Sequence, residues 1–298
     1  MAMLDLPESL LHSLSSVLTQ LQHVLPAPKQ ATDFSAIAFK WQQQQLMAIQ
    51  QPKPMYLDDL IGIERQKDKI IQNTLQFLHG LPANDVLLTG SRGTGKSSIV
   101  RALLTEYAAQ GLRLIEIERD DLSELPQIQQ LIATRSEKFI VYCDDLAFNA
   151  EDENYRSLKS VLDGSLQSGA SNFIIYATSN RRHLLPEFMH ENIPLRKVDV
   201  PQYTELHPQE AIEEKNSLSD RFGLWLSFYP MDQQLYLQIV EHYIVQANLP
   251  YNDTVRSASL QWSQARGQRS GRAAYQFSKH WIGSESLAQY TNQSESAK

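Results

Sequence analysis

The segment from Gly90 to Ser97 constrains the fold more than any other part of the chain. It reads Gly-Ser-Arg-Gly-Thr-Gly-Lys-Ser, follows a candidate strand at 85–89 with an apolar centre, and opens a helical pattern over residues 97–109. Glycines let the backbone turn tightly, so that its N–H groups point inward at an anion, and the start of a helix adds positive potential. This spacing between a strand and a helix is typical of a phosphate-binding loop (P-loop). A chance match in a flexible loop would not explain the flanking strand and helix.

The lysine and the serine of such a loop have separate tasks. Lys96 supplies a cation for the β and γ phosphates of ATP, and the Ser97 hydroxyl is a ligand for Mg²⁺. We therefore expect ATP and Mg²⁺ as cofactors. The residues expected to bind the nucleotide in this loop are Gly90, Ser91, Arg92, Gly93, Thr94, Gly95, Lys96, Ser97 and Ser98.

Short apolar segments alternate with amphipathic ones from residue 55 to about residue 230. Continuously apolar strands between helices predict an α/β fold with a five-stranded parallel sheet covered on both faces, an αβα core. The expected strands are 85–89, 113–117, 138–143, 172–178 and 224–228, and the expected helices are 97–109, 125–134 and 154–166. The polar stretch 190–216 interrupts this pattern, and a short strand at 196–200 with a helix after His207 is expected there.

Polar residues follow two of these strands. Asp144 and Asp145 end the strand 138–143, and Asn180 follows the strand 172–178. Ligands bind at the carboxyl ends of parallel strands, so these side chains are expected beside Lys96. There Asp144 would hold Mg²⁺ through water, Asp145 would orient an attacking water, and Asn180 would sense the γ phosphate. The alternatives are a solvated acidic turn and an asparagine that caps the next helix.

The chain is predicted to have four parts. Residues 1–53 read as an N-terminal helical appendage with helices at 10–25 and 34–49, and residues 54–230 as the nucleotide-binding core. Residues 231–283 read as a small C-terminal helical lid and residues 284–298 as a flexible tail. The expected lid helices are 232–247, 253–265 and 271–281.

Composition excludes several other classes of protein. With 27 Lys and Arg against 34 Asp and Glu, the formal charge is −7, which gives no support for a protein that coats nucleic acid. The single cysteine, Cys143, cannot form an internal disulfide or a cysteine zinc site, and we expect it to be buried. Met1 to Leu25 does not resemble a secretory signal, and no apolar run approaches the roughly 20 residues that span a bilayer. We therefore expect a cytoplasmic protein without a membrane partner.

Residues 55–282 resemble the AAA+ ATPases, because the P-loop, the acidic strand and Asn180 are followed by a helical domain. Leu57 to Glu64 is similar to the first segment of the AAA+ core, whose backbone near Ile61 and Gly62 lines the adenine pocket. Ser219 to Gly223 is similar to the arginine-finger segment of the replication-initiator and helicase-loader branch.

The resemblance implies roles for two arginines. Arg221 would act in trans, in the site of a neighbouring subunit, and Arg272 would reach the nucleotide from the lid. Arg266, Arg269 and Arg272 share one helical side if their segment is continuous, and the alternative is a solvated basic face. The alternative for Arg221 is a surface arginine or a local ion pair.

The closest overall resemblance is to an uncharacterised bacterial family of predicted AAA+ ATPases, carried by residues 142–145 and 221–227. It implies an ATPase that oligomerises and couples hydrolysis to conformational change of a protein or nucleic-acid partner. The alternative is a nucleotide-gated scaffold with little turnover, because Asp145 stands where most AAA+ enzymes have glutamate, with Glu151 a candidate to assist. Small-molecule phosphotransfer is a third hypothesis, disfavoured by Arg221 and Arg272.

Overall fold

The computed structural model describes residues 32–148, 153–163, 172–181 and 218–296. The chain divides at Phe34 into two units, and the described elements belong to the second, residues 34–298. The helix expected at 10–25, Glu151 and the stretch 190–216 lie outside the described residues.

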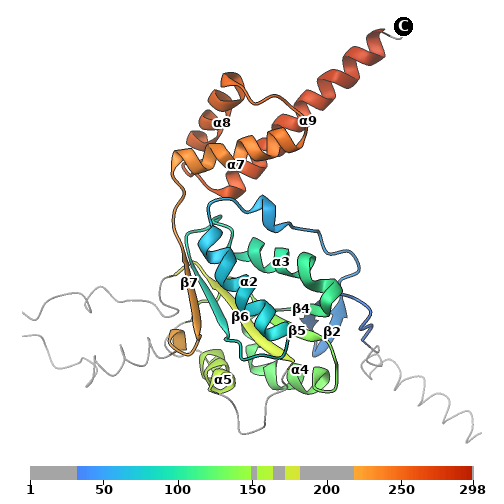
Figure 1. The fold of residues 1–298 in the computed structure, drawn as a ribbon, viewed down its shortest axis with the longest axis vertical. Coiled ribbons are helices and arrows are strands. Elements are labelled where there is room, and N and C mark those ends of the chain that lie inside the picture. The colour runs from blue at the N-terminus through green and yellow to red at the C-terminus, as the bar shows by residue number, and fades with distance from the viewer. Residues whose placement is uncertain (1–31, 149–152, 164–171, 182–217, 297–298) are drawn as a thin grey trace, which may run out of the picture. The chain divides into compact units, whose positions relative to one another are not determined.

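The described residues form one sheet of seven strands in the order β2-β1-β4-β5-β6-β3-β7 (Figure 1). The hairpin strands β1 and β2 are antiparallel, and all the other neighbouring pairs are parallel. The strands are β1 Ala38–Gln42, β2 Gln45–Ala48, β3 Val86–Gly90, β4 Leu112–Ile117, β5 Lys138–Cys143, β6 Phe173–Ser179 and β7 Leu224–Phe228. The five predicted parallel strands, now β3 to β7, are therefore confirmed.

The helix predicted at 34–49 is wrong, because these residues contain the β1–β2 hairpin. The polar cluster there is the turn: Gln43 and Gln44 have φ of 51° and 56°, the left-handed values of a tight hairpin turn. Phe39, Trp41 and Leu46 alternate with less buried neighbours and enter the core. Because β1 pairs with β4, the hairpin extends the sheet and is not part of a separate N-terminal appendage.

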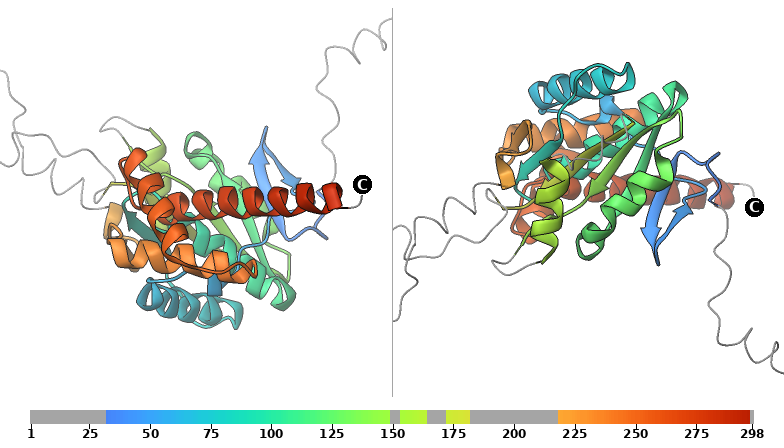
Figure 2. Two further views of the ribbon diagram at one scale, coloured as in Figure 1. Left: turned by 90° about the horizontal axis from the view of Figure 1, so that it is seen from above. Right: turned by 90° about the horizontal axis from the view of Figure 1, so that it is seen from below.

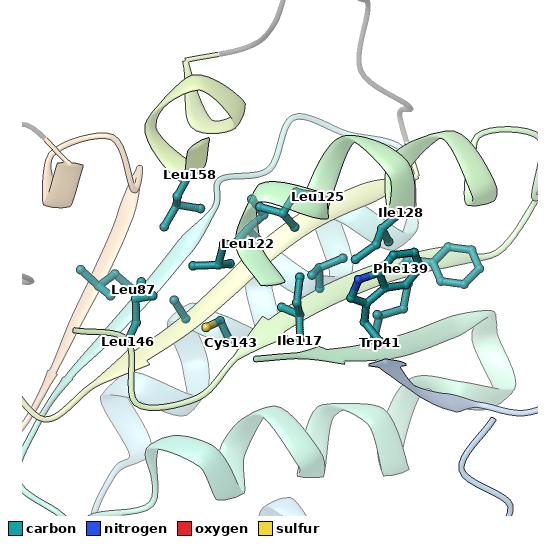
Figure 3. Packing of buried hydrophobic residues seen from close by; sticks show 14 of the residues in the cluster. Trp41, Leu87, Ile117, Leu122, Leu125, Ile128, Phe139, Cys143, Leu146 and Leu158 are labelled. Atoms are coloured by element: carbon teal, nitrogen blue, oxygen red, sulfur yellow. The ribbon is translucent and has the colours of Figure 1, made fainter. Parts of the chain in front are cut away.

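Helices cover both faces of the sheet. The helix α2 (Glu64–Leu78) and the helix α3 (Lys96–Tyr107) share one buried cluster with Ile140 and Tyr142 of β5. The helix α4 (Leu125–Ile132) and the helix α5 (Glu153–Leu162) share the other cluster with Phe139 and Cys143, which is buried as expected (Figure 3). Alternate residues of one strand thus supply two cores. The short 3-10 segments are Leu57–Asp59, Ala108–Gln110 and Arg119–Glu124.

Three helices after β7 form a separate buried cluster, which we call the lid. They are α7 Gln233–Gln246, α8 Asp253–Ala265 and α9 Gly271–Ser296. Asp232 and Asn252 cap α7 and α8 by accepting hydrogen bonds from backbone N–H groups of the first turn. Figure 2 shows α9 as one long helix, so the flexible tail predicted from residue 284 is wrong as far as residue 296. Within the described ranges, no helix combines the length and apolarity that a membrane crossing requires.

Asp85 joins three strands at the amino end of the sheet. Its carboxylate accepts a hydrogen bond of 2.7 Å from the N–H of Ile175 in β6, and its carbonyl accepts one from the N–H of Leu224 in β7. Burial raises the pKa of the Asp85 carboxyl to about 6, against the opposing effect of the hydrogen bond from Ile175. The folded state therefore favours the protonated acid, so this group's contribution to stability is full below its unfolded pKa and is lost as the pH rises through about 6.

We expect Asp85→Asn to raise the melting temperature at pH 7.5 by a few degrees (about 2–5 °C), because the amide keeps an acceptor oxygen without a buried charge. Melting curves of the parent and the variant from about pH 4 to pH 8 test this expectation. The gain should shrink toward pH 4, where the parent is protonated. A gain that is the same at every pH would contradict the assignment.

Candidate nucleotide-binding site

The P-loop lies between the end of β3 at Gly90 and the start of α3 at Lys96. Gly90 has a φ of 134°, and a Cβ atom there would lie 1.9 Å from the carbonyl oxygen of Phe228 in β7. Only glycine fits so close to a neighbouring strand in this conformation. Gly95, with a φ of 100°, is the N-cap of α3, so the helix begins at the predicted lysine and its N-terminus faces the loop.

Lys96 is 6% exposed, and its ammonium group lies inside the loop. It donates hydrogen bonds of 2.6 and 2.8 Å to the carbonyl oxygens of Gly90 and Ser91, and one of 3.0 Å to Oδ1 of Asn180. Burial lowers the pKa of Lys96, while Asp144 and Asp145 act in the opposite direction. The loop, the helix and the end of β6 thus meet at one cation.

A single carboxylate oxygen of Asp144 accepts hydrogen bonds from three hydroxyl groups. Oδ1 accepts hydrogen bonds from Ser97 and Tyr142, both at 2.8 Å, and from Thr178 at 2.5 Å. Burial raises the pKa of Asp144, but these three hydrogen bonds and the charge of Arg101 together outweigh it, and the net effect is a lowered pKa. The carboxylate is therefore held in its charged form, directly beside the serine at the start of α3.

Asp145 forms a tight turn after β5. Its φ is 54°, its N–H donates to Oγ1 of Thr178 at 2.9 Å, and the N–H of Leu146 donates to the Thr178 carbonyl at 2.6 Å. Aspartate tolerates the left-handed region better than longer side chains do, which gives a physical reason for aspartate at this position.

The carboxylate of Asp145 lies between an amide and a guanidinium. Nδ2 of Asn180 donates to its Oδ1 at 2.5 Å, and Arg92 of the P-loop lies 3.7 Å from its Oδ2. Because Asn180 accepts from Lys96 with one atom and donates to Asp145 with the other, it connects the lysine to the second acid. Asn180 makes these contacts directly, which favours a place in the site over the simple helix-cap alternative.

Two oxygen ligands in this site suit Mg²⁺. The hydroxyl of Ser97 and the carboxylate of Asp144 are hard oxygen ligands that lie together at the helix N-terminus. Across the described part of the chain, no group of three or more His, Cys, Asp or Glu is arranged to hold a metal ion. A bound Mg²⁺ would therefore take most of its ligands from phosphate oxygens and water, as this ion commonly does.

The lid contacts the P-loop directly. The N–H of Gly271, at the start of α9, donates to the carbonyl of Gly93 at 2.8 Å, and a Cβ atom on Gly93 would lie 2.8 Å from Cβ of Ser270. The same built atom would lie 3.5 Å from Cβ of Arg272, whose side chain is exposed. The Cβ atom of Arg272 thus lies next to the P-loop backbone at Gly93.

The three lid arginines do not share one helix. Arg266 ends α8 and stacks on the ring of Trp262 at 3.6 Å, whereas Arg272 lies in α9. The shared helical side of Arg266, Arg269 and Arg272 was expected only for a continuous segment, and this condition is not met because the connection after α8 interrupts the helix.

Ile61 and Gly62 lie where the lid meets the first segment of the core. Ile61 packs against the lid cluster, and a Cβ atom on Gly62 would lie 2.3 Å from the side chain of Leu235 in α7. The next residue, Ile63, is 3.4 Å from the position that a Cβ atom would take on Gly95. These residues therefore border both the lid and the P-loop.

Arg221 lies apart from the other predicted residues. It precedes β7, which runs parallel to β3 with Leu224 opposite Val86, so it is at the amino end of the sheet. The P-loop follows the carboxyl end of β3, about 16 Å away along the strand. Nε of Arg221 donates to the carboxylate of Asp163, just after α5.

The sequence did not predict which side chains of the sheet hydrogen-bond to Asp144 or which acid pairs with Arg221. Tyr142 and Thr178 donate to Asp144, and Asp163 accepts from Arg221. The hydrogen bond from Tyr142 could have been inferred from the alternation of side chains along β5, because Tyr142 and Asp144 are two residues apart and face the same side. Thr178 and Asn180 have the same spacing at the end of β6. No local signal pointed to Asp163.

A family described as "Protein of unknown function (DUF815)" matches residues 34–285. The large subunit of replication factor C from Methanococcus maripaludis is 27% identical over 86 residues, which are 29% of this chain and 17% of that subunit. The chain therefore matches only a small part of this relative.

Solved structures share the fold over most of the chain. A point mutant of RuvB from Thermotoga maritima superposes with a TM-score of 0.54 at 16% identity, and the match covers 79% of this chain and 67% of the RuvB chain. The replication initiator DnaA, bound to AMPPCP and single-stranded DNA, gives a TM-score of 0.52 at 18% identity, with 82% and 69% covered. The fold is that of the AAA+ P-loop ATPases, as the sequence predicted.

We expect Gly93→Ala to destabilise the protein more than Gly80→Ala, a matched control. Both glycines have left-handed φ (75° and 71°), but nothing lies within 4 Å of a Cβ atom on Gly80. Backbone strain alone costs about 1–2 kcal/mol, and the contact with Ser270 should add about 1–3 kcal/mol. Calorimetric melting of both variants measures the difference. Equal melting temperatures would show that the lid does not rest on the P-loop, and Ser270→Gly should partly rescue Gly93→Ala.

Proposed function

The chain belongs to the DUF815 family, and we propose that it is an AAA+ ATPase that oligomerises and couples ATP hydrolysis to a conformational change in a protein or nucleic-acid partner. The single observation that carries this proposal is the continuous set of contacts from Lys96 through Asn180 to Asp145, with Ser97 on Asp144 beside it. Three separate strand ends supply the groups that phosphoryl transfer requires.

Each group has a task that its geometry supports. Lys96 exchanges its present carbonyl partners for the β and γ phosphates, because a phosphate oxygen carries more charge than a carbonyl. Asn180 lies between Lys96 and Asp145, where an amide can bond both the γ phosphate and a water. Asp145 then orients that water and accepts its proton. Ser97, and Asp144 through water, would hold Mg²⁺, which would neutralise charge on the phosphates.

The lid and the first core segment supply the rest of the proposed nucleotide site. Ile61 and Gly62 border the lid, and the adjacent Ile63 approaches Gly95 of the P-loop, a position that suits the adenine ring. Arg272 lies in the first turn of α9 beside Gly93, from where its exposed guanidinium can reach a phosphate. Because Gly271 bonds directly to the loop, a change at the phosphates would move the lid.

Arg221 is proposed to complete the site of a neighbouring subunit. It lies at the opposite end of the sheet from its own P-loop, so it is too far from that site to act in cis. A guanidinium can stabilise the charge that spreads over the transferring phosphoryl group. In the single chain Arg221 is paired with Asp163, and this contact has to open or rotate when a neighbour's phosphate arrives.

A second candidate function is a nucleotide-gated scaffold that binds ATP with little turnover. The observation that favours it is that Asp145 is short, is fixed in a left-handed turn and already contacts Asn180 and Arg92.

Single-stranded DNA is bound in the DnaA structure, but the net charge of −7 gives no support for DNA as the partner here.

We expect Lys96→Ala to weaken ATP binding about 100-fold or more. The substitution removes the buried cation of the P-loop, whereas Arg92, the other cation of the loop, is exposed. Lys69→Ala, at an exposed position of α2, is the control and should bind like the parent. Equilibrium binding of a fluorescent ATP analogue measures both. Equal affinity in Lys96→Ala would exclude this loop as the nucleotide site.

We expect Arg221→Ala to bind ATP normally but to lose turnover by about 1,000-fold, together with assembly. The measurement is specific ATPase activity against protein concentration, with Arg65→Ala, an exposed arginine of α2, as the control. Activity that rises with concentration in the parent and is absent from Arg221→Ala would support a shared site. Undiminished turnover of the variant at high concentration would remove this role, and near-zero turnover of a parent that binds ATP would favour the scaffold.

A further inference from the structure

The hydroxyl groups that donate hydrogen bonds to Asp144 point to a function of their own. We propose that Tyr142, together with Thr178, is a positioning residue that fixes the Asp144 carboxylate for Mg²⁺. This inference rests on the proposed function, because it concerns the same metal site.

Tyr142 is built into the sheet so that its hydroxyl ends at the carboxylate. It is 1% exposed and lies in β5, two residues before Asp144, on the face covered by α2 and α3. Its hydroxyl donates to Oδ1 of Asp144 at 2.8 Å. A buried phenol needs a partner for its O–H, and here that partner is the charged acid of the site.

The three hydroxyl groups leave the two carboxylate oxygens with different tasks. Ser97, Tyr142 and Thr178 all donate to Oδ1, and among the described residues none donates to Oδ2. An oxygen that accepts three hydrogen bonds has little capacity left for water bound to a metal ion. Oδ2 is therefore the atom that faces the metal-bound water. Tyr142 and Thr178, the two buried donors, prevent the carboxylate from rotating.

The same arrangement orients Ser97. Its hydroxyl proton is directed to Asp144, so the lone pairs of its oxygen remain available to a cation. If Asp144 rotated, the serine would lose this acceptor, and both Mg²⁺ contacts would weaken together. Tyr142 and Thr178 thus act on the ion through Asp144 rather than by touching it.

The sheet offers a matched control for Tyr142. Tyr176 is its register partner in β6 and is 0% exposed. The Tyr176 hydroxyl contacts Thr74 at 2.8 Å and the amide of Asn73 at 3.2 Å, both in α2. Phenylalanine in either position removes one buried hydroxyl from the same layer, but only in Tyr142→Phe is a hydrogen bond to Asp144 lost.

The test is the Mg²⁺ dependence of nucleotide binding by the full chain. A fluorescent ATP analogue is titrated in EDTA and at increasing Mg²⁺ concentrations, with no turnover measured. We expect Tyr142→Phe to bind like the parent in EDTA, but to need about tenfold more Mg²⁺ for half of the Mg²⁺-dependent tightening. Tyr176→Phe should keep the parent's Mg²⁺ requirement, whatever its melting temperature.

Each outcome decides the matter. A parent-like Mg²⁺ requirement in Tyr142→Phe, or an equal shift in Tyr176→Phe, would overturn the inference while leaving the proposed function intact. A parent chain whose binding does not tighten with Mg²⁺ would overturn both. If Tyr142→Phe does not fold, Thr178→Val decides in its place, with Thr178→Ser, which keeps the hydroxyl, as its control. Thr178→Val should shift the Mg²⁺ requirement in the same direction.

Discussion

A buried ammonium group must be surrounded by oxygen atoms, and Lys96 meets this requirement with atoms from separate segments. Two carbonyls come from the loop that precedes it and one amide oxygen from the end of β6. These segments meet because β3 and β6 are parallel neighbours that end at the same edge of the sheet. The turn at Asp145 and the hydroxyls on Asp144 are arranged around this point, and a cation left without oxygen partners there would be costly.

The lid adds a mechanical link to this electrostatic centre. Gly93 has no Cβ, so Ser270 and the start of α9 approach the loop closely enough for a backbone hydrogen bond. Asp59, just before the P-loop domain's first long helix, contacts His242 of α7 at 2.9 Å, and Lys53 contacts Tyr275 of α9 at 2.9 Å. The lid is thus held to the core at several points, and of these three described contacts the one with Gly93 is at the P-loop. This placement suits a lid that responds to nucleotide.

How far the sequence could be interpreted differed from one part of the chain to another. The P-loop, the acidic strand and Asn180 could be placed together because the carboxyl ends of parallel strands converge, and the structure brings Lys96, Asp145 and Asn180 into contact. The hairpin at residues 38–48 was misread as a helix because a short apolar segment fits either period. Its pairing with β4 is a long-range contact that no local pattern reveals. The helix predicted at 271–281 was too short, because the C-terminal half of α9 is polar although helix-forming residues continue to Ser296.

The strand–loop–helix unit of the P-loop and the positions of Asp144, Asp145 and Asn180 at strand ends can be inferred from the amino-acid sequence, because they depend on local conformation and on strand order. Which atoms share a hydrogen-bond partner depends on the packing of the whole fold. The three donors to one oxygen of Asp144 come from α3, β5 and β6, and the pair of Arg221 with Asp163 joins residues 58 positions apart. Such contacts depend on how strands and helices pack, since side chains distant in sequence meet only when the core has formed.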